Sequence, residues 1–253
     1  MAGVNRIKVD GIGFDYGNTL VSDPFERVMK LKSLDFVRVL EANGYEVYGR
    51  KFVKAWAKTN RNVNYPYCSH FSQEIPLIKA LLESLGVKKN DRNKLSQPLL
   101  ATYRSGLKYV MKNDKGITHA RDVLAELRRR GKKLMILSNE RMDTIDIQLR
   151  WTGLWRYFDR IIVSERLKAE KPDQRMFTYM MKAFGMPKER ILYVGDDPER
   201  DIKPAKALGM KAVMLEQPQE LGNTWRNYTT TLAGNEKPDA VIKDLAELLQ
   251  IVR

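Results

Sequence analysis

The chain has 253 residues, 43% of them hydrophobic and 30% charged, with a formal net charge of +14 at pH 7, which is typical of a globular protein with one large domain or two modest ones. Its longest apolar runs fall well short of the roughly 20 residues that cross a membrane, its first residues lack the apolar block of a signal peptide, and its single cysteine, Cys68, excludes an internal disulfide. We therefore expect a cytoplasmic protein with no membrane association.

The first predicted element is a buried strand over residues 7–14, which contains Ile7, Val9, Ile12 and Phe14. This strand runs directly into Asp15, and the polar turn "DYGNTL" follows. A carboxylate at the end of a buried strand is the first candidate functional group in the chain.

Residues 24–112 have a different character, because apolar residues recur there at helical spacing without a convincing strand. The apolar positions that predict these helices are Val28, Leu31, Leu34, Phe36, Val37, Leu40, Phe52, Val53, Trp56, Ile75, Ile78, Leu81, Leu82 and Leu85. Gly44 and Gly86 follow two of the helices and are expected to end them. The segment is therefore predicted to be wholly helical.

Much of the positive charge lies in this helical segment. Residues 21–115 hold 18 Lys or Arg against 9 Asp or Glu, a net charge of +9. Three interpretations stay open: attraction of an anionic substrate, contact with nucleic acid, or a solvated, charge-rich surface. We recognise no nucleic-acid-binding module in the sequence, so nucleic acid is the weaker expectation as a partner.

From about residue 117 helices and strands alternate, which predicts an α/β fold with a doubly wound parallel sheet. The expected helices cover residues 119–130, 141–150, 173–184 and 199–208, and the expected strands cover 132–138, 159–164, 190–196 and 211–215. A polar connection over 217–238 precedes a last strand and a closing helix, and Trp151 and Trp155 are expected in the core. The predicted domains are an α/β core of residues 1–20 and 113–253, and an inserted helical cap of residues 21–112.

Polar and charged residues follow several of the predicted strands. In an open parallel sheet, ligands bind beyond the carboxyl ends of the strands. The residues predicted to meet at that edge are Asp15, Ser138, Asn139, Lys171, Asp196, Asp197 and Asp201. Each of them alone has an ordinary explanation, since Ser-Asn after a strand is usually a helix cap, but their convergence at one edge indicates a functional site.

Four motifs carry a resemblance to a known family: "FDYGNTL", "LMILSN", "KAEKPDQRMF" and "ILYVGDDPERD". With these motifs in this order, the chain resembles the haloacid dehalogenase (HAD) superfamily, in the subtype with a helical cap inserted after the first motif. The resemblance covers nearly the whole chain. It implies a Rossmann-like core and a Mg²⁺-dependent phosphatase that transfers a phosphoryl group to an aspartate.

The resemblance also assigns roles to residues. Asp15 is the expected nucleophile, because a carboxylate stays ionised at neutral pH, and Lys171 would neutralise charge and keep Asp15 ionised. The expected metal ligands are Asp15, the backbone carbonyl of Gly17, Asp196 and Asp201, with Asp197 and Thr19 supporting them; Thr19 could equally be a plain turn residue. The expected phosphate-binding groups are Ser138, Asn139, Lys171 and the turn amides at Tyr16 and Gly17.

Gly17 departs from the family pattern. Most family phosphatases have a second aspartate at this position, two residues after the nucleophile, which acts as general acid and base. General acid–base catalysis is worth about 10²–10⁴-fold in rate, so the departure predicts a slow phosphatase best suited to acyl or aryl phosphates. Two alternatives stay open: the cap supplies the missing group from His70, Tyr65 or Tyr67, or the protein binds its ligand with little turnover.

Other branches of the family fit the sequence less well. Phosphonate-cleaving members use a cap lysine, but nothing distinguishes one among Lys30, Lys32, Lys51, Lys54 and Lys58. Dehalogenating members need no metal, and the acidic cluster in "GDDPERD" argues against that chemistry here.

We therefore expect a Mg²⁺-dependent phosphatase acting on a small phosphorylated metabolite. The alternative is a binding or regulatory protein that senses a phosphorylated ligand, or nucleic acid through its basic cap. Residues 20–23 and 112–117 are expected to act as hinges for cap closure, and residues 62–71 to contribute to specificity. The identity of the substrate and the oligomeric state are left open.

Overall fold

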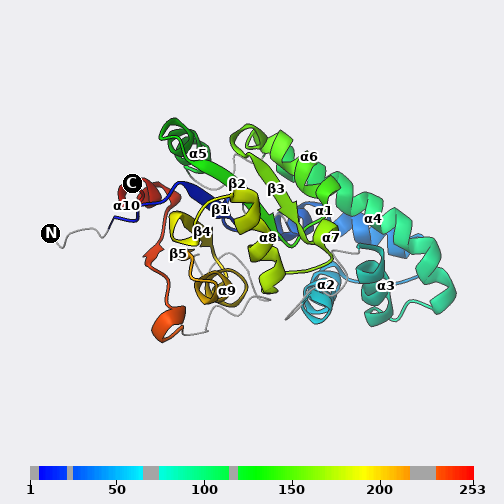
Figure 1. The fold of residues 1–253 in the computed structure, drawn as a ribbon. Helices are drawn as coiled ribbons and strands as arrows, with labels where there is room; N and C mark the ends of the chain where they lie inside the picture. Colours follow the sequence, from blue (N-terminus) through cyan, green and yellow to red (C-terminus); the bar gives the residue numbers. More distant parts are fainter. Residues whose placement is uncertain (1–5, 22–24, 65–73, 114–118, 217–231) are drawn as a thin grey trace. The chain divides into compact units, whose positions relative to one another are not determined.

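The computed structural model describes residues 6–21, 25–64, 74–113, 119–216 and 232–253 (Figure 1). The described residues form two compact units. One consists of residues 6–21, 119–216 and 232–253 and holds the β-sheet; we call it the sheet unit. The other consists of residues 25–64 and 74–113 and is helical; we call it the helical unit.

The sheet unit is built on six parallel strands in the order β3-β2-β1-β4-β5-β6. The strands are β1 (Gly11–Phe14), β2 (Lys133–Ser138), β3 (Arg160–Val163), β4 (Ile191–Gly195), β5 (Lys211–Leu215) and β6 (Ala240–Ile242). Central strands β1 and β4 are buried along their whole length, as expected for a parallel sheet covered on both faces. The predicted α/β fold with a parallel sheet is confirmed.

Helices follow the strands along the chain, as in other doubly wound sheets (Figure 1). They are α5 (Ala120–Arg129), α6 (Met142–Thr152), α7 (Ser164–Leu167), α8 (Gln174–Phe184), α9 (Lys203–Ala207) and α10 (Leu248–Ile251). Short helical turns are η1 (Trp155–Tyr157), η2 (Lys188–Arg190), η3 (Pro198–Ile202), η5 (Gly234–Glu236) and η6 (Leu245–Glu247). Helix α8 begins where the Asp173 carboxylate accepts the Arg175 amide, 2.8 Å away, and it ends at Gly185, whose φ of 63° suits glycine.

One face of the sheet packs against α8, η3 and α9. Met135 and Leu137 of β2 lie in one apolar cluster with Phe177 and Met180 of α8 and with Ile202 at the end of η3. Because side chains alternate along a strand, Leu134 and Ile136, which are also buried, face the other way. The sheet therefore buries apolar side chains on both of its faces.

The helical unit consists of α1 (Phe25–Glu41), α2 (Gly49–Asn64), α3 (Glu74–Ser84) and α4 (Lys89–Lys112). Its core contains an aromatic cluster in which Trp56 lies 5.1 Å from Phe36, 5.5 Å from Phe52 and 5.5 Å from Tyr103, between ring centroids. Gly106 of α4 lets α1 pack closely, since a Cβ there would lie 2.7 Å from Cγ of Lys32.

Several sequence-based expectations were wrong in detail. The first strand begins at Gly11, and Ile7 makes only an isolated bridge to Val252. The helix expected over 199–208 is split into η3 and α9. Trp155 was expected in the core but is 47% exposed, with the Arg150 guanidinium 4.7 Å from its ring centroid.

Leu31 and Leu34, which helped to predict the first helix, lie on its exposed side.

Other expectations stay predictions. Residues 65–71, including Cys68 and His70, lie outside the described part of the chain, as do residues 22–23 and 114–117 of the two expected hinges. The predicted domain boundaries also stay predictions. No helix within the described ranges combines the length and the apolar character needed to span a bilayer.

Candidate active site

The candidate site lies where the order of the sheet reverses direction. Strands β2 and β3 lie on one side of the β1–β4 pair, and β5 and β6 on the other. Ligands of open α/β sheets bind at such a switch point, beyond the carboxyl ends of the strands, here those of β1 and β4. Asp15 continues this pairing one residue past Phe14, since its amide donates a 2.9 Å hydrogen bond to the carbonyl of Val194. The fold thereby brings Asp15 beside the residues that follow β4.

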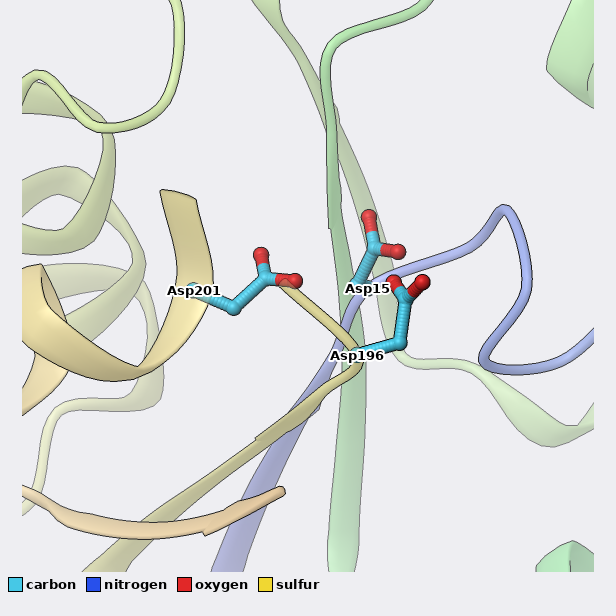
Figure 2. A group of neighbouring side chains, drawn as sticks. All are labelled: Asp15, Asp196 and Asp201. Carbon is cyan, nitrogen blue, oxygen red and sulfur yellow. The ribbon is translucent and has the colours of Figure 1, made fainter. Parts of the chain in front are cut away.

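Three carboxylates meet at this point. Asp15 comes from the end of β1, Asp196 from the end of β4 and Asp201 from η3 (Figure 2). One oxygen of each lies within 4.8 Å of the others, and the residues are 6%, 2% and 1% exposed, respectively. Buried like charges repel one another strongly, so this arrangement requires compensating positive charge.

Lys171 supplies part of that compensation. Its Nζ lies 2.5 Å from Oδ1 of Asp15 and 2.7 Å from Oδ1 of Asp201, and the residue is 3% exposed. Burial by itself lowers the pKa of Lys171, but Asp15 and Asp201 outweigh it and raise that pKa above its ordinary value. Burial raises the pKa of Asp201 to about 7, although the charge of Lys171 opposes the shift.

Thr19 ties the turn after β1 to two of the carboxylates. Its hydroxyl lies 3.3 Å from Oδ2 of Asp15 and 3.5 Å from Oδ1 of Asp196. The turn closes through the carbonyl of Tyr16, which accepts the Leu20 amide at 2.9 Å. The roles of the Tyr16 amide and of the Gly17 amide and carbonyl toward phosphate or metal stay predictions.

Ser138 and Asn139 follow β2 at the same edge. Ser138 is the last residue of β2 and is buried, and its phosphate-binding role stays a prediction. Asn139 holds the backbone of Lys171: its Oδ1 accepts the Lys171 amide at 2.7 Å, and its Nδ2 donates to the Lys171 carbonyl at 3.0 Å. Asn139 was predicted to bind phosphate, and these two contacts to the Lys171 backbone were not predicted.

The segment after β4 is organised around Asp201. The Asp197 carboxylate accepts the amides of Glu199 and Arg200, each at 2.9 Å, and so caps η3. The amide of Asp197 in turn donates to Oδ2 of Asp201 at 3.1 Å. Gly195 leaves room for this carboxylate, because a Cβ there would lie 2.5 Å from Cγ of Asp201. The π-helical turn η3 therefore aims Asp201 back at the strand ends.

Tyr193 is a residue of the site that was not predicted from the sequence. It lies within β4, is fully buried, and its hydroxyl is 3.2 Å from Nζ of Lys171 and 3.3 Å from Oδ1 of Asp201. Burial, followed by the charges of Asp201 and Asp15, raises the pKa of Tyr193 well above its ordinary value. A hydroxyl within an otherwise apolar strand, three residues before Asp196, was the available signal.

The donor set fits a hard divalent cation. Mg²⁺ prefers oxygen ligands, usually one or two carboxylates completed by water or substrate oxygens, and oxygens of Asp15, Asp196 and Asp201 lie close enough together to surround one ion. Lys171 is the one buried cation of the described chain, against these three buried acids. The three carboxylates outnumber the one buried ammonium, so the cluster can accept further positive charge.

Comparisons with known proteins show the family of the chain. A family model described as haloacid dehalogenase-like hydrolase matches residues 35–215. A phosphoserine phosphatase of Thermus thermophilus is 36% identical over 94 residues, 37% of this chain and 38% of that protein. A glyceraldehyde 3-phosphate phosphatase of Methanocaldococcus jannaschii is 33% identical over 135 residues, 53% of this chain and 55% of that protein. The chain thus spans about half or less of the length of these two relatives.

Solved structures share the fold at low identity. The magnesium-bound HAD-hydrolase YfnB from Bacillus subtilis is 21% identical with a TM-score of 0.69, over 96% of this chain and 98% of that one. A 2-haloacid dehalogenase from Pseudomonas syringae is 19% identical with a TM-score of 0.65, over 96% and 97% of the two chains. At these identities the likeness shows the fold alone.

Proposed function

The chain belongs to the haloacid dehalogenase-like hydrolase family, and on that premise we propose that it is a Mg²⁺-dependent phosphatase acting on a small phosphorylated metabolite. The observation that carries the proposal is the buried cluster in which Lys171 bridges Asp15 and Asp201 beside Asp196. The names of the relatives, which include phosphatases of phosphoserine and of glyceraldehyde 3-phosphate, support the same substrate class.

In the proposed reaction, a carboxylate oxygen of Asp15 forms a bond to phosphorus while the bond from phosphorus to the ester oxygen breaks. Lys171, 2.5 Å from Asp15, keeps that carboxylate ionised and offsets its repulsion from the incoming anion. Water then hydrolyses the aspartyl phosphate, which releases phosphate and restores the Asp15 carboxylate. The ester oxygen leaves as an anion that takes its proton from solvent water, because Gly17 has no side chain to supply one.

Asp15, Asp196 and Asp201 would hold the metal, since their oxygens lie within 4.8 Å of one another. When bound, Mg²⁺ would offset negative charge on the phosphoryl oxygens. The Lys171 ammonium lies between Asp15 and Asp201, so it would balance charge on the reacting group in addition to the metal.

The Gly17 position predicts a preference among substrates. A leaving group that is stable as an anion, such as a phenolate or a carboxylate, needs no proton, so aryl and acyl phosphates should react faster than alkyl phosphates. General acid–base catalysis contributes about 10²–10⁴-fold. We therefore expect Gly17→Asp to raise turnover of alkyl phosphates, and a fall or no change would contradict the proton-relay argument.

The main test is hydrolysis of an aryl phosphate with Mg²⁺. Wild type should release phosphate, Asp15→Asn should lose that activity, and EDTA should abolish it. Asp10→Asn is the matched control, because Asp10 precedes the same strand at its opposite end, where it pairs with Arg190. Equal activity in wild type and Asp15→Asn, or none in either, would contradict the proposal.

Metal binding has a readout that is independent of turnover. Mg²⁺ should raise the thermal unfolding midpoint of the wild type, because a ligand that binds only the folded state stabilises it. The shift should be smaller in Asp196→Asn. An equal shift in both proteins would count against the proposed ligand set.

A second candidate function, binding of nucleic acid, rests on one face of α2. Arg50, Lys51, Lys54 and Lys58 line a cavity of about 470 Å³ next to Tyr48, which is 80% exposed. The helix contains no acidic residue, and within the described residues none of these four cations forms an ion pair. An unpaired row of cations beside an aromatic ring suits a phosphate backbone with a base to stack.

Salt dependence tests this second function. Single-stranded RNA should bind wild type with an affinity that falls steeply with salt, and replacement of Lys51, Lys54 and Lys58 by Gln should reduce the slope by about 2. A matched control replaces Lys133, Lys182 and Lys188, exposed lysines of the sheet unit. The same slope for both triple variants would rule out α2 as the binding face.

A further inference from the structure

Tyr193 reaches across the central strand of the sheet. It belongs to β4 and is the register partner of Gly13 in β1, whereas Leu137 belongs to β2 on the other side of β1. Nevertheless the Tyr193 hydroxyl lies 3.2 Å from the carbonyl oxygen of Leu137. The tyrosine ring must therefore pass over β1 at the level of Gly13.

Only glycine at position 13 leaves space for this path. A Cβ on Gly13 would lie 3.0 Å from Cδ2 of Tyr193 and 2.5 Å from Sδ of Met180. On its other side the ring makes an edge-to-face contact with Phe177, with 5.1 Å between centroids. The ring is thus held in place from both sides.

At the end of this path the hydroxyl meets Lys171. A lysine ammonium has three hydrogens to donate, and Nζ of Lys171 has three acceptors: Asp15 Oδ1 at 2.5 Å, Asp201 Oδ1 at 2.7 Å and the Tyr193 hydroxyl at 3.2 Å. Each hydrogen of the ammonium therefore has its own acceptor. Asn139 holds the other end of the same residue through the Lys171 amide and carbonyl.

We propose that Tyr193 is a positioning residue, which accepts the third hydrogen of the Lys171 ammonium and fixes it between Asp15 and Asp201. Without the hydroxyl, the ammonium keeps two acceptors and can rotate or shift away from the nucleophile. The consequence for turnover rests on the proposed phosphatase function, but the contact itself does not. A purely structural role would need only the ring, which fills the space between Gly13 and Phe177.

Tyr193→Phe separates these two roles, because it removes the hydroxyl and keeps the ring. In the phosphatase assay we expect kcat to fall about tenfold, the size of one lost hydrogen bond to a charged group, with KM changed less than twofold. Tyr179→Phe is the matched control, since Tyr179 lies on α8 and is 42% exposed. If the wild type is active, an unchanged kcat in Tyr193→Phe would overturn the proposal.

A spectroscopic test works whether or not the protein is a phosphatase. In protein labelled with ¹⁵N at lysine Nζ, the buried Lys171 ammonium should give a slowly exchanging signal, assigned by its absence from Lys171→Met. That signal should shift or broaden in Tyr193→Phe and stay in place in Tyr179→Phe. An unchanged signal in Tyr193→Phe, or a wild-type ammonium that exchanges too fast to observe, would overturn the proposal.

Two glycine variants of β1 provide a second, independent comparison. Gly13→Ala should displace the Tyr193 ring and perturb the Lys171 signal. Gly11→Ala introduces a similar clash, at 2.9 Å from Met186 Sδ and Phe184 Cδ1, but touches neither Tyr193 nor Lys171. Both variants should lose stability, and only Gly13→Ala should change the signal; an equal change in both would contradict the proposed path. If only the phosphatase proposal is wrong, the wild type will be inactive but will still give the Lys171 ammonium signal.

Discussion

The sheet unit and the helical unit bury different kinds of side chain. Within the described residues, the sheet unit buries four charged side chains, Asp15, Lys171, Asp196 and Asp201, all at the carboxyl edge of β1 and β4. The helical unit buries no charged side chain in its described part, and its interior is apolar around the Trp56 aromatic cluster. Burial of charge costs free energy unless each ion is paired, whereas apolar burial stabilises. The comparison supports the proposal that the sheet edge serves chemistry, whereas the helical interior serves stability.

Removal of the central cation should produce the largest combined effect. Lys171→Ala leaves Asp15 and Asp201 buried without the ammonium that now bridges them. We expect a loss of about 3–5 kcal/mol in the free energy of unfolding and a fall in kcat of about 10²–10³-fold, measured by denaturant unfolding and by aryl phosphate hydrolysis. If Lys171→Ala proved as stable as wild type, the inferred free-energy cost of burying unpaired charge in the sheet unit would be wrong.

Removal of an aromatic ring from the helical unit should reduce stability alone. Trp56→Ala empties the space between Phe36, Phe52 and Tyr103 and should cost about 3–5 kcal/mol on unfolding in denaturant. Trp155→Ala is the control, because Trp155 is 47% exposed, and should cost less than about 1 kcal/mol. Folded Trp56→Ala should keep the Mg²⁺-induced rise in unfolding midpoint. Loss of that rise would contradict the proposal that the sheet unit binds the metal and the helical interior serves stability alone.

A methyl group added at the sheet edge should disturb the site with a smaller loss of stability. Gly195→Ala places a Cβ 2.5 Å from Cγ of Asp201, which should cost about 1–3 kcal/mol and weaken Mg²⁺ binding measured by calorimetry. Gly49→Ala is the matched control, since a Cβ there meets no atom within 4 Å. Equal Mg²⁺ affinity in the two variants would show that the close approach of Gly195 to Asp201 has no functional role.

The smallest effect concerns a structural ion pair of the sheet unit away from the cluster. Burial raises the pKa of Asp239, but hydrogen bonds from Lys206 and from the Ala212 amide outweigh it and lower that pKa below its ordinary value. The carboxylate therefore stabilises the fold above about pH 4, the ordinary value, and its contribution is lost as the pH falls through the lowered folded pKa. Asp239→Asn should cost about 1 kcal/mol at pH 7.

The difference in the free energy of unfolding between Asp239→Asn and wild type should shrink as the pH is lowered from 7 to 2, measured by unfolding at each pH. Asp146→Asn, which breaks an exposed pair with Arg150 one helical turn away, should change stability by less than about 0.5 kcal/mol. A difference for Asp239→Asn that grew as the pH fell would reverse the sign of the argument.

The sequence predicts what depends on periodicity and on strand ends. Helical spacing around Phe36 and Trp56 predicted the helical unit, and helix–strand alternation predicted a parallel sheet that places Asp15 near Asp196. Both inferences work because a repeating pattern encodes which face is buried. They required no knowledge of individual side-chain directions.

Side-chain direction accounts for most of what the sequence did not reveal. Asn139 looks like a phosphate ligand or a helix cap, and only the path of the chain near Lys171 shows that its amide holds a backbone segment. Tyr193 looks like an ordinary buried aromatic residue, because its hydroxyl contacts depend on a glycine 180 positions earlier in the chain. Trp155 looks like core, but its ring lies against the Arg150 guanidinium instead.

The pairing of β1 with β4 has a consequence for biosynthesis. The described part of the helical unit lies within residues 25–113, so it is synthesised before most of the sheet unit, and domains generally fold as units during synthesis. Strand β1 emerges first but is a central strand, and one of its two neighbours, β4, is made about 180 residues later. Until β4 is made, β1 cannot pair on that side, and an unpaired strand edge promotes aggregation. The edge that brings Asp15 beside Asp196 therefore forms only after most of the chain has been synthesised.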